Sequence, residues 1–240
     1  MVARKASKRV ATDALLVRRV DYGEADLVIT LLTQRVGKVS ALARGARKSN
    51  KRFTGALEPM HTLAVELDER PGAELFTLLE AKLKVPRVGI LGSLVAMEAA
   101  GKALSWVRRA APPRTPEEAP YQVLCTLLDR LTQTPTAEAS ALALAEAGLC
   151  LLSAFGWGID FERCVRCGRQ AQAAQSASVD ATRGGLICRS CGGARLRLSA
   201  EARQRMARAA AGETGVLTGD EAASALSLVE AALGAHAGIE

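Results

Sequence analysis

The sequence predicts an α+β protein with a small β-barrel in its first third, a helical domain after it, and a four-cysteine module set into the helical domain. Three observations support this fold class. Short apolar runs separated by turn residues fill residues 12–84, alanine- and leucine-rich segments with helical spacing follow residue 86, and two Cys-x-x-Cys pairs stand among the helical segments. We therefore divide the chain into a barrel domain at 1–85, a helical domain at 86–160 and 199–240, and a cysteine module at 161–198.

Five strands are expected in the first part of the chain. They cover Ala14 to Val20, Leu27 to Leu32, Lys38 to Ala43, Leu63 to Leu67 and Leu75 to Leu79. Five short strands in this space favour a closed barrel over an open sheet, because closure removes exposed strand edges. We predict an OB fold, with an SH3-like barrel as the alternative. Residues 1–11 form a basic extension to which we assign no element.

The segment RGARKSNKR, residues 44–52, carries five positive charges and no acidic residue. Residues 1–52 hold 13 Lys or Arg against four acidic residues, a balance of +9, so the rest of the chain sums to −2 within the total of +7. Such clustering indicates an anionic polymer or a membrane surface as partner. If the partner is an anionic polymer, we expect Gly45 to allow close approach of the backbone to it, and phosphate contacts from Arg44, Arg47, Lys48, Lys51 and Arg52. A solvated loop without a partner is the alternative.

Helices are expected beyond residue 86. They cover Leu94 to Arg109, Tyr121 to Leu131, Glu138 to Phe155, Ser199 to Ala211 and Gly219 to Leu233, and the segment PPRTPEEAP separates the first two. The helix from Glu138 is apolar almost all round, which predicts the central helix of a bundle. Cys125 and Cys150 lie on these helices and are expected to be small buried hydrophobes.

The two Cys-x-x-Cys pairs are Cys164 with Cys167 and Cys188 with Cys191, and 20 residues separate the pairs. This spacing is typical of a four-thiolate zinc site, and the glycine after each pair permits the positive φ of a tight turn. The segment SVDATRGGLIC predicts a hairpin between the pairs, so we expect a zinc ribbon with one zinc ion per chain. Four thiolates leave no open coordination position, which makes the zinc structural. A redox pair would stand at a helix start in a βαβ unit, and neither pair has that context.

Other charged and polar residues give no catalytic pattern. The two histidines are His61, at the edge of an apolar strand, and His236, near the chain end; GxGxxG, Walker and GxSxG patterns are absent from the sequence. Three acids share one turn, where capping or solvation is the ordinary role: Asp21, Glu24 and Asp26. We predict that the protein is not an enzyme. Residues 160–198 hold seven Arg and three acids, which fits either nucleic-acid contact or solvation of a small module.

The cellular location of the protein can be predicted from its N-terminal residues and its longest apolar stretch. No apolar h-region follows MVARKASKRVA, so no signal peptide is expected. The longest weakly polar stretch, Ala147 to Ile159, is shorter than the about 20 residues that cross a bilayer. We expect a soluble, cytoplasmic protein with no membrane partner.

The segment YGEADLVITLLTQRVGKVSALARGARKSNKRFTGALEPM, residues 22–60, resembles the N-terminal domain of the bacterial recombination mediator family RecO. The likeness lies in a Glu-x-Asp turn, a Gly-Lys strand start, a Gly-Ala-Arg basic loop and a Leu-x-Pro. The module from Phe161 to Cys191, with GGLICRSC at its end, is similar to that of the zinc-binding members. The resemblance covers nearly the whole chain and implies an OB-fold domain followed by a helical domain that carries the zinc module.

The resemblance also implies a role in DNA repair and recombination, in association with the nucleoid. Family members bind single- and double-stranded DNA and anneal strands coated with single-stranded-DNA-binding protein, whose tail docks on the helical domain; with RecR they help to load RecA. Aromatic content is only 3%, with Tyr22, Phe53 and Phe76 in the barrel region, so phosphates rather than stacked bases should supply the attraction. Two alternatives are a zinc-ribbon protein that binds RNA in transcription or the ribosome, and a thiol-dependent enzyme.

Overall fold

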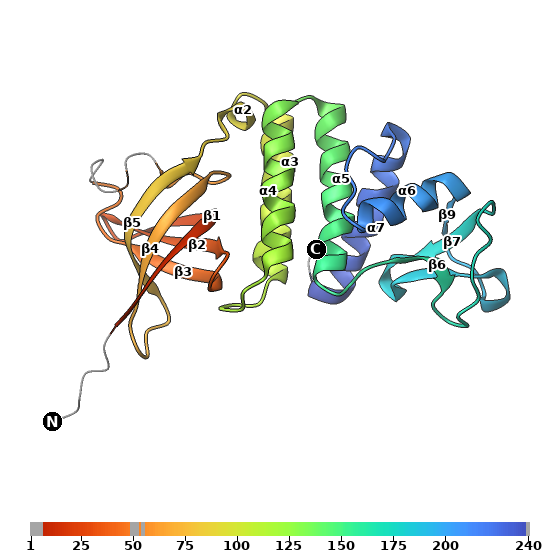
Figure 1. Ribbon diagram of the computed structural model, residues 1–240, viewed down its shortest axis with the longest axis horizontal. Coiled ribbons are helices and arrows are strands. Elements are labelled where there is room, and N and C mark those ends of the chain that lie inside the picture. Colours follow the sequence, from red (N-terminus) through yellow and green to blue (C-terminus); the bar gives the residue numbers. More distant parts are fainter. Residues whose placement is uncertain (1–6, 49–52, 54–55, 239–240) are drawn as a thin grey trace. The chain divides into compact units, whose positions relative to one another are not determined.

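The computed structural model describes residues 7–48, 53 and 56–238. The chain divides into two compact units, Met1–Val88 with Ala111–Tyr121, and Gly89–Ala110 with Gln122–Glu240. Figure 1 shows strands in the first unit and helices with a small second sheet in the other. The three-domain division expected from the sequence stays a prediction.

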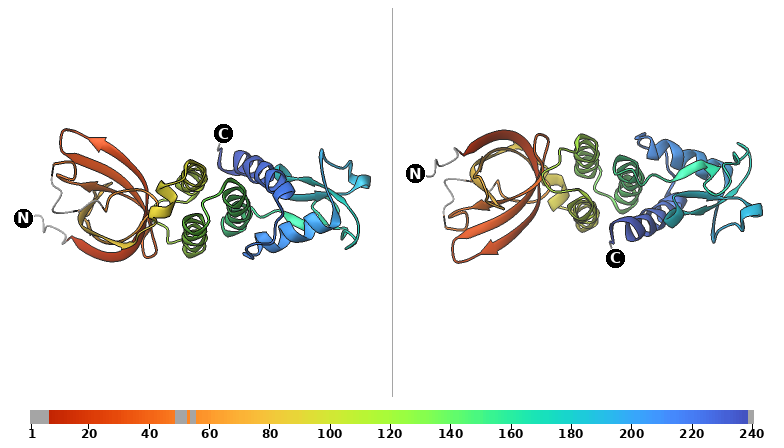
Figure 2. Two further views of the ribbon diagram at one scale, coloured as in Figure 1. Left: turned by 90° about the horizontal axis from the view of Figure 1, so that it is seen from above. Right: turned by 90° about the horizontal axis from the view of Figure 1, so that it is seen from below.

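Five strands build the first unit. They are β1 (Lys8–Tyr22), β2 (Asp26–Thr33), β3 (Gly37–Ala43), β4 (Thr62–Glu69) and β5 (Phe76–Val85). They close into a barrel in the order β1-β2-β3-β5-β4, because β1 pairs with both β2 and β4 while β3 runs parallel to β5. Figure 2 shows the strands curling into a ring. A five-stranded barrel in which β5 lies between β3 and β4 has the strand order of the OB fold. This is the barrel type that the sequence predicts.

The barrel interior is filled by aliphatic side chains from every strand. Leu16, Ile29, Leu31 and Leu63 are fully buried, and each such side chain contributes about 1.5–3 kcal/mol relative to exposure. Along β2 and β3, buried residues alternate with more exposed ones, which is the period-2 pattern of a sheet with one buried face. In the sequence these strands appear as short apolar runs separated by turn residues.

The first strand begins six residues before the predicted one. Lys8 stands opposite Glu69 and Arg9 opposite Asp68 on β4, so leaving this part of the basic extension without an element was wrong. A register shift between Leu16 and Arg18 bends the strand and lets its two halves pair with different neighbours. Arg9 forms a cross-strand ion pair with Glu66 on β4 (3.5 Å), so an acid of the neighbouring strand accommodates one of the charges that masked the strand in the sequence.

The proline-rich segment between the first two long helices packs on the barrel. The Arg114 N–H donates to the carbonyl of Lys38 (2.8 Å), and its guanidinium pairs with Glu69 (3.0 Å). At Gly37, where φ is +69°, a Cβ atom would lie only 1.9 Å from the Thr115 carbonyl oxygen. Only glycine leaves room for this close approach.

The second unit contains most of the helical residues. The helices are α2 (Val88–Leu91), α3 (Leu94–Ala110), α4 (Glu118–Gln133), α5 (Ala137–Ala154), α6 (Ala200–Ala210) and α7 (Gly219–Ala237). The five predicted helices are present, and the short α2 was not predicted. Helix α5 packs against α3, α6 and α7, as expected for a central helix. At Gly148 a Cβ atom would lie 2.9 Å from the Val229 side chain, so α5 and α7 approach closely there.

Helix α5 is also long and apolar enough to cross a membrane by length and composition, with 56% of it buried inside the protein. This stretch is longer than the one expected from the sequence. It carries Glu146, which is only 2% exposed and pairs with Arg130. A core helix of a folded domain accounts for both its apolar character and its buried, paired carboxylate.

The cysteine module forms a second sheet. Its strands β6 (Asp160–Cys164), β7 (Ala177–Asp180), β8 (Gly185–Ile187) and β9 (Leu196–Leu198) are arranged in the order β6-β8-β7-β9, with short 3₁₀ turns at Ala181–Arg183 and Arg189–Cys191. The predicted hairpin is the antiparallel β7–β8 pair, and Gly184 turns it with φ +77°. Together with the barrel and the helices, this module confirms the predicted α+β fold class.

One buried side chain ties this module to the helices. Arg203 on α6 is 4% exposed and donates to the carbonyls of Phe161 (2.7 Å) and Gln172 (2.9 Å). Both acceptors are backbone carbonyls, so the buried guanidinium fixes the start of the module against α6.

Candidate metal centre and nucleic-acid interface

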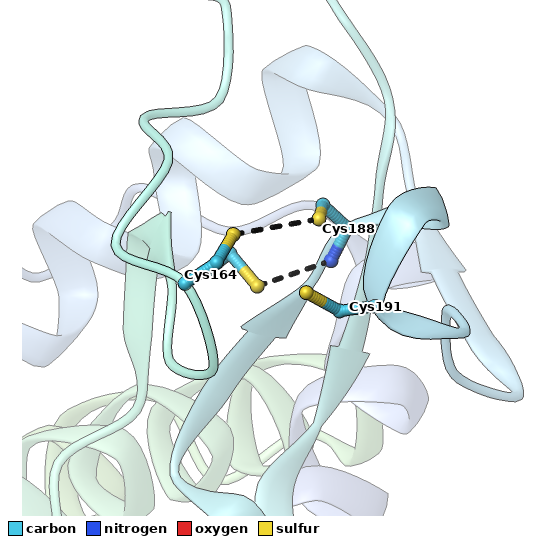
Figure 3. Close-up of side chains that lie close together, drawn as sticks. Cys164, Cys188 and Cys191 are labelled. Atoms are coloured by element: carbon cyan, nitrogen blue, oxygen red, sulfur yellow. Dashed lines mark hydrogen bonds between the residues drawn. The ribbon is translucent and has the colours of Figure 1, made fainter.

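Four cysteines meet at one point of the module. The sulfur atoms of Cys164, Cys167, Cys188 and Cys191 all lie within 4.8 Å of one another. The Sγ atoms of Cys167 and Cys188 are 3.7 Å apart, close to the ~3.8 Å between two ligands of a tetrahedral ion with Zn–S bonds of ~2.3 Å. Figure 3 shows the labelled cysteines converging from separate segments of the module. The donor set therefore fits a tetrahedral metal ion.

The backbone around each pair turns as the sequence predicts. Gly168 has φ +72° and Gly192 has φ +104°, a conformation that side chains rarely adopt. The Gly168 N–H donates to the Cys164 carbonyl (2.8 Å), which closes the first turn, and the Cys188 N–H donates to the Cys164 sulfur (3.4 Å). Both pairs therefore form knuckles that aim two sulfurs at a shared point.

Because the four thiols lie close together, the pKa values of Cys164 and Cys191 move in opposite directions. The N–H of Cys188 and other backbone donors lower the pKa of Cys164 to about 6. Shared protons with the sulfurs of Cys188 and Cys167 raise the pKa of Cys191 to about 12. Four thiolates cannot form together at this spacing without a cation among them, so the cluster is suited to a divalent ion that displaces the protons. Four sulfur ligands suit zinc and leave no position for water.

The other two cysteines lie apart from this centre. Cys125 on α4 and Cys150 on α5 are both half-buried. Burial raises the pKa of Cys150, which keeps the thiol protonated near neutral pH. Their environment is less enclosed than the sequence suggests.

The basic loop begins directly after β3. Gly45 has φ +69° and its N–H donates to the Asp26 carboxylate (2.7 Å). The Arg47 N–H donates to the Ala25 carbonyl (2.9 Å), so the loop is fastened to the turn between β1 and β2. Lys51 and Arg52, the other two predicted contacts in this segment, lie outside the described residues.

Acidic residues of that turn face the basic loop. Arg47 pairs with Asp21 at 3.2 Å and Lys48 with Glu24 at 3.6 Å. Within the described part of the chain, Arg44 is exposed and forms no ion pair. Sequence reasoning assigned the acids to capping or solvation; Asp26 is a cap, but the two ion pairs were missed because they join separate segments. The sequence held one hint: the acids Asp21 and Glu24 follow one another in the same order as their basic partners Arg47 and Lys48.

These ion pairs are weak because they are open to water. The side chains of Asp21 and Glu24 are 67% and 93% exposed, and such surface pairs contribute about 0–1 kcal/mol. A phosphate that approaches the loop can replace either carboxylate at little cost. The two acids therefore contact the basic loop only through weak surface ion pairs.

Aromatic side chains are scarce on the barrel surface. Phe53 and Phe76 are each 3% exposed and belong to the barrel core. Tyr22, at the end of β1, is 58% exposed and is the one exposed aromatic residue in the described part of the barrel. Stacking on several bases in a row, as many OB folds use, has no platform here.

Both histidines have structural neighbours. His61 is 5% exposed and its Nδ1 accepts the Arg87 N–H (3.1 Å). Burial lowers the pKa of His61, and the Arg87 charge lowers it further, so the ring stays neutral at pH 7. His236 stacks on Trp157, with 5.9 Å between ring centroids.

Comparison with known proteins gives matches over both units. Residues 8–87 match the family described as Recombination protein O N terminal, and residues 92–239 match Recombination protein O C terminal. The DNA repair protein RecO of Geobacter sulfurreducens is 34% identical over 232 residues, which cover 95% of this chain and 92% of the relative. Two relatives of the same name from Anaeromyxobacter are similar over shorter spans. That of strain K is 38% identical, covering 76% and 70% of the two chains, and that of strain Fw109-5 is 36% identical, covering 77% and 71%.

Proposed function

The chain belongs to the RecO family of DNA repair proteins, and from this membership we propose that it acts as a recombination mediator with no catalytic step of its own. It binds single- and double-stranded DNA and anneals complementary strands. With RecR it assists the loading of RecA onto single strands coated with single-stranded-DNA-binding protein. The observation that carries this proposal is the exposed basic loop fastened to the rim of the barrel.

The loop attracts DNA through its phosphates. Arg44 is open to solvent, and Arg47 and Lys48 leave weak surface pairs when a phosphate arrives. Lys51 and Arg52 add two charges to the same segment. The lack of an aromatic platform means that binding ignores base sequence and tolerates one strand or two.

Annealing requires no bond to be made or broken by the protein. Two strands repel through their phosphates, and a cationic surface that binds each of them screens this repulsion. Contacts to phosphates alone let a strand slide until complementary bases meet. The barrel domain, residues 1–85, is the part of the chain to which we assign this work.

We assign one structural zinc ion per chain to Cys164, Cys167, Cys188 and Cys191. A bound zinc would supply folding energy and no chemistry, because four thiolates close its coordination sphere. The cysteines themselves join β6 and the turn after it to the segment after β8, which Arg166 also contacts through the Cys191 carbonyl (2.7 Å). A thiol-dependent reaction would need these sulfurs free.

The remaining partners follow from the family. RecR and the acidic tail of single-stranded-DNA-binding protein bind the chain directly, the tail on the helical domain, and RecA acts downstream. Such work takes place in the cytoplasm, at the nucleoid.

Annealing of complementary strands coated with single-stranded-DNA-binding protein, with and without RecR, tests this function. We compare the wild-type chain with a loop-neutral variant that carries Arg44→Gln, Arg47→Gln, Lys48→Gln, Lys51→Gln and Arg52→Gln. The wild-type chain is expected to anneal the strands and the variant to lose most of that rate. A folded wild-type chain that does not anneal them would contradict the proposal. A preference for structured RNA over DNA would favour the RNA-binding alternative.

A further inference from the structure

A polar groove of about 660 Å³ lies on the cysteine module beside the metal centre. Three arginines line it, Arg169, Arg189 and Arg197, together with serines, glutamines and two of the cysteines. No acidic residue is among those that line the groove. Its size is within the range of sites that hold small ligands or one unit of a polymer.

The arginines of the module fall into two groups. Arg163 pairs with Asp160 (3.3 Å) and Arg183 with Asp180 (3.4 Å), so two of the module's three carboxylates are already matched outside the groove. The three groove arginines have no carboxylate within ion-pair distance among the described residues. Their positive charge is therefore uncompensated by the protein.

Two of the groove arginines instead contact hydroxyl groups. Arg197 donates twice to the Ser176 hydroxyl (2.9 and 2.6 Å), and Arg169 donates to the Ser190 hydroxyl (3.3 Å). These neutral contacts orient the guanidinium groups and leave other N–H donors unused. A planar guanidinium with spare donors is well suited to phosphate oxygens, which it can bind in pairs.

Charge and shape both favour a phosphate over a base or a peptide. Four thiolates around one divalent ion carry a net charge of −2, which the three arginines of the groove exceed. The groove is lined by no aromatic side chain, so a base has nothing on which to stack. Its larger apolar side chains are Leu186 and Ile187, both almost fully buried.

We propose that this groove is a second phosphate-binding site, which takes the sugar-phosphate backbone of single-stranded DNA. The proposal rests on the proposed function, since it supplies a second contact for the same polymer. When a strand is bound at the basic loop, its effective concentration at a second site on the same chain is raised. The two sites also offer a place for each of two strands during annealing.

The test compares two charge-matched variants. The groove variant carries Arg169→Gln, Arg189→Gln and Arg197→Gln. The control variant carries Arg163→Gln, Arg183→Gln and Arg195→Gln, which remove three charges from the same module outside the groove. Asp160 and Asp180 keep backbone N–H donors in the control, from Glu162 (2.8 Å) and Thr182 (3.1 Å). Zinc content and melting report on folding in both.

The measurement is binding of a labelled, mixed-sequence single strand at several salt concentrations. Each variant is made in the wild-type chain and in the loop-neutral chain, where the groove contributes most of the remaining affinity. Three lost contacts at about 0.7 each lower the salt slope by about 2, which is on the order of 10²-fold in affinity at 0.1 M salt. The control variant is expected to change binding several-fold less.

Two results would overturn the groove while the proposed function stands. One is equal binding by the groove and control variants when both are folded and hold zinc. The other is a loop-neutral chain that retains no measurable affinity although the wild-type chain binds. A wild-type chain that fails to bind the strand would instead contradict the proposed function, and the groove with it.

Discussion

Glu146 is a buried carboxylate on an otherwise apolar helix. It accepts the N–H groups of Gly215 (3.0 Å), Val216 (2.7 Å) and Leu217 (3.0 Å), and it pairs with Arg130 (2.7 Å). One side chain thus satisfies three consecutive donors of the loop between α6 and α7. Burial of a charge is tolerated here because every oxygen is engaged.

Replacing Glu146 with Gln is expected to lower the free energy of unfolding by about 3 kcal/mol, because the amide leaves Arg130 without its charge partner and offers one acceptor in place of two. Chemical denaturation at pH 7 measures the loss. Glu138→Gln, an exposed change on the same helix, is the control. Equal losses from the two substitutions would show that the buried carboxylate has no special role.

The same residue predicts a pH dependence. Burial alone would raise the pKa of Glu146, but the N–H groups and Arg130 outweigh it, so the pKa lies below the ordinary 4.5. A carboxylate with a lowered folded-state pKa contributes stability above its unfolded pKa and loses it as pH falls through the folded pKa. The stability difference between wild type and Glu146→Gln should therefore be constant near neutral pH and shrink below about pH 4.5. A difference that grows on acidification would contradict this assignment.

The roles of some residues could be predicted from the sequence, and those of others could not. The four cysteines were predictable because each knuckle is encoded by two cysteines with two residues between them and a following glycine. The partners of Glu146 were not, since the loop that it holds lies about 70 residues away in the chain. Pairing across such a separation depends on how α5 meets α6 and α7, which no local pattern encodes.

The loop after β3 and the turn between β1 and β2 act together as one surface. Backbone donors of the loop bind Asp26 and Ala25 of the turn, and the two ion pairs lie beside these bonds. The acids thereby hold the loop and also lower its attraction for an anion.

Neutralising Asp21 and Glu24 together, as Asp21→Asn and Glu24→Gln, should strengthen binding to single strands several-fold, because Arg47 and Lys48 lose competing carboxylates. Fluorescence anisotropy at low salt measures the gain. The matched control is Glu66→Gln with Glu80→Gln, which frees Arg9 and Lys82 elsewhere on the barrel. An equal gain in the control would mean that net charge, and not the loop, decides affinity.

Elements with a regular period were predictable, and contacts between elements were not. The strands followed from short apolar runs separated by turn residues and the helices from their apolar spacing. The need for glycine at position 37 was not predictable, because it comes from Thr115, which packs against Gly37 from a distant segment. The proline-rich segment therefore looked like a plain connection until the barrel surface beneath it was known.

At the level of the whole chain, the two units differ in what stabilises them. The barrel unit has a continuous aliphatic core of its own. The second unit includes the cysteine module, whose strands are only three to five residues long. The clustered cysteines lie within this module, and Arg203 of α6 contacts its start through the Phe161 and Gln172 carbonyls. Fold class could be predicted from the sequence because each part has its own pattern.

Replacing any one of the four clustered cysteines with serine is expected to loosen the second unit and to leave the barrel folded. Structural zinc contributes on the order of 10 kcal/mol in small modules, so its loss should lower the melting temperature of that unit clearly. Metal analysis of the purified chain and thermal melting test this. A chain without zinc, or serine variants that melt as the wild type does, would contradict the zinc assignment.

The phosphate grip of the basic loop is tested by a salt titration of single-strand binding, comparing the wild-type chain with the loop-neutral variant on mixed sequences. Five lost contacts at about 0.7 each should lower the slope of log affinity against log salt by about 3.5, whatever the sequence of the strand. Gln removes the charges without placing new carboxylates beside Asp21 and Glu24, and zinc content and melting confirm that the variant is folded. A folded variant that keeps the wild-type slope and affinity would show that the loop does not hold DNA.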